Sequence, residues 1–228
     1  MKKLIIIIFI ILLNTLSGFA QVDISKLPVN IVSSVSNPDA PFILYITGDG
    51  GWNKFSQLLA GQMASKGYPV VSLNANKFFW QKKTPDQIAA AISALVRNYQ
   101  REWNRKKFVL VGYSFGADVM PFAYNQLPKE LVAQVENITL LSPSPATDFE
   151  IHVMVMLGNK GGGQRVSSAI NKITDKPVIL FFGEGENDFK IGDIPGKNIT
   201  IEKLAGGHHY DGDEANVVNK IIQHIPKK

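Results

Sequence analysis

The chain has 228 residues, of which 45% are hydrophobic and 19% charged, and a formal net charge of +5 at pH 7. This length allows one domain with a sizeable core but is short for two. The absence of cysteine excludes disulfides, thiolate nucleophiles and thiolate metal ligands. The positive charge is spread without a long basic block, so it does not support direct nucleic-acid binding.

The first 20 residues have the order of a secretory signal peptide. Two lysines precede an apolar run from Leu4 to Leu13, and small residues precede Gln21. The run is shorter than the roughly 18 to 20 residues that a membrane span needs. We therefore expect cleavage near Ala20 and a periplasmic protein. Residues 21–228 then form a single domain, and loss of the two lysines lowers its charge from +5 to +3.

Apolar, β-prone runs alternate with helical patterns along the rest of the chain. Thr84 and Gln87 can form a capping box around Pro85, which indicates a helix that ends near Trp103. This alternation predicts an α/β fold with a mostly parallel central sheet and helices on both faces. Residues 142–168 lack a clear pattern, and we expect a minimal cap or none. The expected strands are 41–46, 68–73, 108–111, 138–141, 178–182 and 199–204, and the expected helices begin near Trp52, Thr84, Gly116 and Asp213.

The sequence Gly112-Tyr113-Ser114-Phe115-Gly116 has the pattern G-x-S-x-G and lies between an expected strand and an expected helix. In this setting the two glycines let the strand and the helix approach closely, and the serine hydroxyl stands above the sheet. The pattern alone is common, whereas the strand-turn-helix context is specific. It predicts an α/β-hydrolase fold with Ser114 as the nucleophile.

A serine nucleophile needs a base and a carboxylate, which follow it in the chain order Ser, Asp or Glu, His in this fold. The segment 183–188 follows an expected strand and contains three carboxylates. We choose Asp188 as the acid, with Glu186 as the alternative. We prefer His208 as the base because two glycines directly before it allow a tight loop. His209 is the alternative base, or helps to shape the pocket.

The oxyanion that forms during attack needs two N–H donors. We expect one from Phe115, the residue after the nucleophile, and the other from Asp49, with Gly50 as the alternative, in the glycine-rich loop after the first long strand. Asp49, Asp118, Asp211 and Asp213 fall in loops or first helical turns around Ser114, so the pocket rim is expected to be acidic and to suit a cationic substrate group. The expected substrate contacts are Trp52, Asp118, His209 and Asp211.

Three motifs together point to a known family: residues 47–52, residues 112–122 and residues 206–213. They resemble the bacterial virulence family of VirJ and AcvB. The resemblance implies a periplasmic α/β-hydrolase in which Ser114, Asp188 and His208 take the triad roles. For AcvB-like members it implies hydrolysis of lysyl-phosphatidylglycerol, and for VirJ-like members a link to type IV secretion.

The leading hypothesis is a serine ester hydrolase that forms an acyl-enzyme and acts on an aminoacylated phospholipid or another ester. The rival hypothesis is a periplasmic binding or assembly factor that contacts secretion-system proteins and does not need catalysis. No metal or organic cofactor and no direct nucleic-acid partner is expected. The two adjacent histidines lack an evident third metal ligand. We expect a monomer.

Overall fold

The computed structural model describes residues 22–33, 39–151 and 163–226. The expected signal peptide, residues 1–20, lies outside these described residues. So do residues 152–162, the middle of the segment 142–168 in which a cap was considered, and that expectation stays a prediction.

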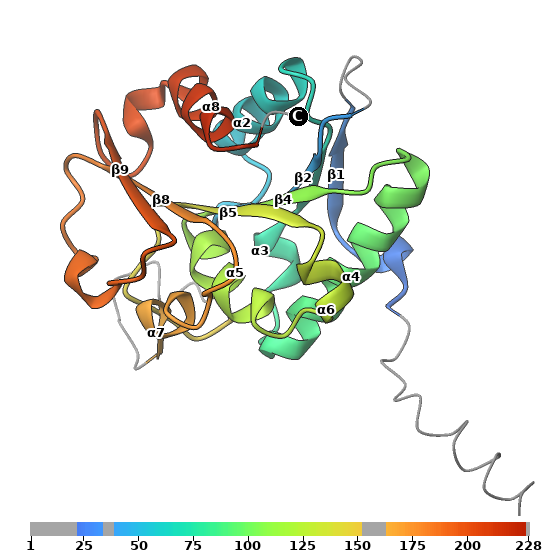
Figure 1. Cartoon of the computed structure of the whole chain (residues 1–228), viewed down its shortest axis with the longest axis horizontal. Coiled ribbons are helices and arrows are strands. Elements are labelled where there is room, and N and C mark those ends of the chain that lie inside the picture. The colour runs from blue at the N-terminus through green and yellow to red at the C-terminus, as the bar shows by residue number, and fades with distance from the viewer. Residues whose placement is uncertain (1–21, 34–38, 152–162, 227–228) are drawn as a thin grey trace, which may run out of the picture.

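A seven-stranded sheet with the order β1-β3-β2-β4-β5-β8-β9 forms the centre of the fold (Figure 1). Only β1 runs antiparallel to its neighbour, and every other adjacent pair in this sheet is parallel. The strands are β1 (Val29–Val32), β2 (Phe42–Ile46), β3 (Val70–Leu73), β4 (Phe108–Tyr113), β5 (Val135–Leu141), β8 (Val178–Gly183) and β9 (Ile199–Leu204). A separate pair joins β6 (Ala146–Thr147) and β7 (Gln164–Arg165). The predicted mostly parallel sheet is confirmed.

Helices cover both faces of the sheet, as predicted. Figure 1 shows α2 and α8 on one face and α4, α5, α6 and α7 on the other. The helices are α2 (Lys54–Ser65), α3 (Ala75–Phe78), α4 (Pro85–Glu102), α5 (Phe115–Tyr124), α6 (Lys129–Val132), α7 (Val166–Ile170) and α8 (Glu214–Gln223). Helix α4 begins with the predicted capping box, in which Thr84 and Gln87 each bind the other's backbone N–H.

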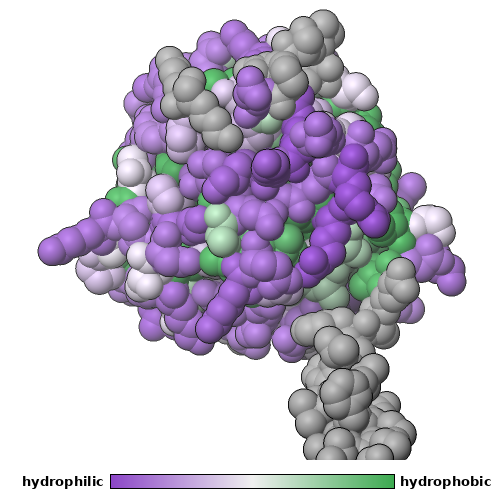
Figure 2. All heavy atoms as spheres, turned by 45° about the vertical axis from the view of Figure 1, so that its right-hand side comes forward, coloured by the Kyte–Doolittle hydropathy of each residue, from purple (hydrophilic) through white to green (hydrophobic). Residues whose placement is uncertain are grey.

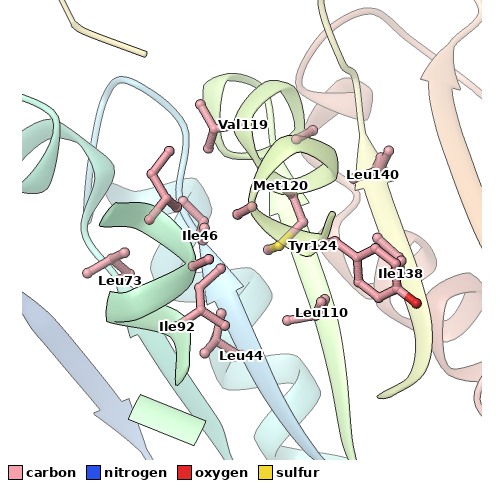
Figure 3. Close-up of a cluster of buried hydrophobic side chains, with 14 of the residues drawn as sticks. Leu44, Ile46, Leu73, Ile92, Leu110, Val119, Met120, Tyr124, Ile138 and Leu140 are labelled. Carbon is pink, nitrogen blue, oxygen red and sulfur yellow. The ribbon is translucent and has the colours of Figure 1, made fainter. Parts of the chain in front are cut away.

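The central strands are buried along their whole length, which explains their continuous apolar sequences. All residues of β2, β3, β4 and β8 are buried, as expected for parallel strands with helices on both sides. Leu44 and Leu110 from neighbouring strands pack against Ile92 of α4 and Met120 of α5 (Figure 3). This layer fixes α5, the helix that follows Ser114, on the sheet.

The surface is mainly hydrophilic on the side that turns forward from the right of Figure 1. Figure 2 shows mostly hydrophilic residues there, with one larger apolar area toward the right of the view and smaller ones elsewhere. Among the residues that the structure describes, no helix is both long and apolar enough to cross a membrane.

We expect Leu110→Ala to lower the free energy of unfolding by about 2–5 kcal/mol, because it removes buried methyl groups from the fully packed centre of the sheet. The matched control is Leu58→Ala on α2, where the leucine is 40% exposed and the expected change is within about 0.5 kcal/mol. Urea unfolding measures both. Equal losses in the two variants would contradict this account of the core.

Candidate active site

Ser114 lies in a sharp turn between the end of β4 and the start of α5. Its backbone has φ 52° and ψ −119°, a conformation that is uncommon for a residue with a side chain. The Ser114 N–H donates to the Leu141 carbonyl at 2.8 Å, which fixes the turn on the neighbouring strand. Although Ser114 precedes α5, its side chain does not cap the helix. The hydroxyl is therefore available for another partner.

Two glycines make this turn possible because backbone atoms occupy the space where side chains would be. A Cβ at Gly112 would lie 2.5 Å from the Gly116 carbonyl oxygen, and a Cβ at Gly116 would lie 2.2 Å from the Ile46 carbonyl oxygen. No side chain fits at such distances. The glycines of the G-x-S-x-G motif thus serve the close approach of strand and helix, as predicted.

A continuous hydrogen-bonded chain joins Ser114, His208 and Glu186. The Ser114 Oγ lies 2.9 Å from Nε2 of His208, and Nδ1 of the same ring lies 2.7 Å from Oε1 of Glu186. In the tautomer with its proton on Nδ1, His208 donates to the carboxylate and accepts from the serine hydroxyl. Tyr113 donates its hydroxyl to the His208 carbonyl at 3.2 Å, which holds the histidine loop beside the serine.

The structure corrects the choice of Asp188 as the acid. Directly after β8, the Glu186 N–H donates to the Gly183 carbonyl at 2.9 Å, and the Gly183 N–H donates back to the Glu186 carboxylate at 2.7 Å. This tight turn directs Glu186 toward His208. Asp188 comes two residues later, is exposed, and contacts no other residue by a hydrogen bond or ion pair in the described part of the chain.

Ser142 and Tyr210 support the Glu186 carboxylate on the side away from His208, and the sequence analysis predicted a role for neither residue. The Ser142 hydroxyl donates to Oε2 of Glu186 at 2.7 Å, and the Tyr210 hydroxyl lies 2.7 Å from Ser142 Oγ. Both residues are buried. The only available hint was that Ser142 follows the strand next to β8, at the same edge of the sheet as Glu186.

The hydrogen bonds shift the pKa values of Glu186 and His208 in opposite directions. Partial burial alone would raise the pKa of Glu186, but the hydrogen bonds that its carboxylate accepts, above all from His208, lower the pKa below its usual value. The hydrogen bond to Glu186 is the main reason that the pKa of His208 rises above 6.5, against the effect of partial burial. An ionised Glu186 therefore stabilises a protonated His208.

The loop after β2 lies against the serine and presents a free donor. A Cβ at Gly48 would contact the Ser114 side chain at 3.3 Å. The Gly50 N–H donates to the Asp49 carboxylate at 2.8 Å, so it is already satisfied. By contrast, neither the Asp49 N–H nor the Phe115 N–H donates to another described residue. Of the two alternatives for the second oxyanion donor, this arrangement favours Asp49 over Gly50.

The other residues expected to contact the substrate have different surroundings. Trp52 is half-buried, and His209 is exposed with its ring 5.5 Å from that of Phe55. Asp211 is exposed and packs against Gly206. Asp213 accepts from the Asn216 N–H and caps α8, which is a structural role.

Asp118 does not lie on the pocket rim, and the structure corrects that expectation. Its side chain is 4% exposed and accepts a hydrogen bond from the Ser144 N–H at 2.5 Å. Burial raises the pKa of Asp118 to about 7, although hydrogen bonds from Ser144 lower it. Near neutral pH this carboxyl group is therefore only partly ionised, and its contribution to an acidic rim is reduced.

A pocket of about 350 Å³ adjoins the outer side of the loop after β2. Its lining includes Gly50, Gly51 and Trp52 together with Asn74 and Asn76. The Asn76 side chain donates to the Asp49 carbonyl at 2.8 Å and so connects the pocket wall to the loop after β2. Within residues 22–33, 39–151 and 163–226, no three histidine or carboxylate side chains come together as ligands for a metal ion.

Solved structures with low sequence identity share this fold. Est1E from Butyrivibrio proteoclasticus, solved with ferulic acid bound, is 15% identical over 86% of this chain and 93% of its own, with a TM-score of 0.62. MenH from S. aureus is 13% identical over 86% and 97% of the two chains, with a TM-score of 0.61. A thioesterase domain from the curacin biosynthetic pathway is 14% identical over 87% and 99%, with a TM-score of 0.58. These similarities confirm the α/β-hydrolase fold.

The sequence comparisons identify the family. No curated protein sequence matches the chain at a significant level. The model of a family described as bacterial virulence protein (VirJ) matches residues 40–228, most of the chain. The chain therefore belongs to the VirJ family of bacterial virulence proteins.

Proposed function

We propose that this protein is a periplasmic serine ester hydrolase. The observation that carries the proposal is the unbroken chain of hydrogen bonds from Ser114 through His208 to Glu186, at 2.9 and 2.7 Å. A serine hydroxyl becomes a good nucleophile when a neighbouring base accepts its proton and a carboxylate orients that base. The fold shared with esterases and a thioesterase supports the same chemistry.

In the proposed reaction, Ser114 Oγ attacks the ester carbonyl carbon while Nε2 of His208 accepts the hydroxyl proton. The carbonyl oxygen becomes an oxyanion, which the N–H groups of Phe115 and Asp49 stabilise. Collapse of this intermediate breaks the ester bond, and protonated His208 gives its proton to the leaving alcohol. Water, deprotonated by His208, then attacks the acyl-enzyme, which releases the acid and restores Ser114.

We propose an aminoacylated phospholipid of the lysyl-phosphatidylglycerol type as the substrate. The resemblance of the motifs to those of AcvB-like members supports this substrate, and the signal-peptide pattern of residues 1–20 supports a periplasmic location. The half-buried Asp49 and the exposed Asp211 provide carboxylates near the site for a cationic headgroup. Asp118 lies deeper and is partly protonated at neutral pH, so it contributes less to this attraction.

The decisive experiment incubates the purified mature protein with lysyl-phosphatidylglycerol and, separately, with a soluble short-chain ester. We expect release of free lysine from the lipid, and loss of both activities by at least about 10³-fold in Ser114→Ala. Mass spectrometry of the lipid products and amino-acid analysis give the readout. If Ser114→Ala cleaves neither ester yet restores the phenotype of a deletion strain, the protein acts instead as a binding or assembly factor.

Glu186→Gln and Asp188→Asn form a matched pair that identifies the acid. We expect Glu186→Gln to lower kcat/KM by about 10²- to 10⁴-fold, because the amide can no longer stabilise the protonated His208. Asp188→Asn changes an exposed carboxylate and is expected to leave kcat/KM within about twofold. Steady-state kinetics on the short-chain ester measure both. A greater loss in Asp188→Asn would contradict the assignment of Glu186.

The pH dependence of kcat/KM follows from the need for an unprotonated His208. Because Glu186 raises the pKa of His208 above 6.5, activity is expected to fall as the pH drops through that raised pKa. In Glu186→Gln the main cause of the rise is gone, so the acid limb of the residual activity is expected to move to lower pH. An unchanged acid limb would show that another group controls it.

A further inference from the structure

Trp80 is the most exposed large hydrophobic residue in the described part of the chain. Its side chain is 64% exposed, whereas the other exposed large hydrophobic residues, Ile31, Leu58 and Ile191, range from 37% to 41%. It lies in the turn between α3 and α4. An indole in this position exposes apolar surface that no described residue covers.

Lysines surround this tryptophan in a part of the sequence without acids. No Asp or Glu occurs between Asp49 and Asp86, a stretch that holds five lysines. Three of them flank Trp80: Lys77 and Lys82 are exposed, and Lys83 is half-buried with Nζ 5.5 Å from the centre of the Phe78 ring.

Three acids lie near this turn, as many as its three flanking lysines, but only one of these acids is exposed whereas two of the lysines are. Asp148 and Glu150 are half-buried on the segment that pairs with the turn, and Asp86 is exposed in the first turn of α4. Along the sequence, Lys77 precedes Trp80 by three positions and Lys82 follows it by two.

The turn is fixed at the rim of the candidate active site. Phe79, adjacent to Trp80, is fully buried, and its ring lies 4.9 Å from the ring of Phe115, the residue after Ser114. The Phe79 carbonyl accepts from the Ile151 N–H at 3.0 Å, and the Lys83 N–H donates to the Phe149 carbonyl at 3.1 Å. Trp80 is thus held at the edge of the sheet where the strands end and Ser114 lies.

We propose that the turn from Lys77 to Lys83, with Trp80 at its centre, docks the protein onto an anionic phospholipid surface. Indole rings are favoured at the level of lipid headgroups, where their apolar ring and polar N–H are both accommodated. Clustered lysines add electrostatic attraction to anionic lipids, about fivefold in affinity for each one. Docking would bring the rim of the site to the headgroups that carry the ester bond. Only this last step rests on the proposed function.

Sedimentation with vesicles tests the docking. The mature protein is mixed with vesicles of phosphatidylcholine containing about 30% phosphatidylglycerol, and with vesicles of phosphatidylcholine alone. We expect strong binding to the anionic vesicles only, and weaker binding as salt rises. Trp80→Ala is expected to weaken binding at least about tenfold, and Lys82→Gln with Lys83→Gln about 25-fold.

A charge-matched control replaces Lys66 and Lys106 with Gln. Lys66 follows the end of α2 and Lys106 precedes β4, so both lie at the edge of the sheet opposite to Trp80. Both lysines are exposed. This variant is expected to bind like the wild type. If the two double variants lose vesicle binding equally, the attraction comes from the general basic charge of the chain and not from the turn. That result would overturn the proposal. Equal binding to neutral vesicles would overturn it as well.

Kinetics on two substrates separate docking from catalysis. The Trp80 and Lys82/Lys83 variants are expected to hydrolyse a soluble short-chain ester like the wild type, and to turn over a vesicle-embedded ester more slowly, in proportion to their loss of binding. Ser114→Ala is expected to bind vesicles normally. If the protein binds anionic vesicles but cleaves no ester, docking stands and the proposed function fails. Wild-type vesicle binding in the Trp80 and lysine variants would overturn the docking proposal.

Discussion

The backbone contact between Gly116 and β2 is the constraint on which the site depends. Helix α5 can begin directly above the sheet only because a hydrogen atom occupies the position where a Cβ would lie 2.2 Å from the Ile46 carbonyl oxygen. The close approach places Ser114 next to the loop after β2, which holds the Asp49 N–H. It also lets α5 bury Met120 and its neighbours on the central strands (Figure 3). The packing of the core and the position of Ser114 are therefore consequences of one contact.

Around Ser114, Glu186 connects three separate segments of the chain. Its carboxylate accepts hydrogen bonds from the histidine loop, from the end of β5 through Ser142, and from the end of β8 through the Gly183 N–H. Tyr210 extends this connection to the start of the last helical region. Since parallel strands bring their carboxyl ends to the same edge, residues that are distant in sequence meet there. The carboxylate acts as the centre of this assembly.

The fold was predictable from the sequence because the buried strands are continuous apolar runs. The motif glycines were recognisable because the close approach of strand and helix leaves no room for a side chain. The sequence did not indicate β1, a four-residue edge strand that is only partly buried and lacks an apolar run. The sequence analysis chose Asp188 instead of Glu186 as the carboxylate beside His208, because composition does not reveal how a tight turn orients side chains. It placed Asp118 on the rim, because a first helical turn can face solvent or the sheet. Ser142 and Tyr210 become recognisable only when the strand ends are brought together.

The backbone conformation of the site has a consequence for stability. Six described residues other than glycine have a positive φ, and four of them are Ser114, Ser142, Tyr210 and Asp211, all at or beside the site. Such conformations are unfavourable for residues with a side chain and persist only when the surrounding structure imposes them. Part of the folding free energy of the core thus maintains the shape of the site. A glycine in place of Ser114 would relieve the strain at this position, so the hydroxyl group is retained there at a cost in backbone free energy.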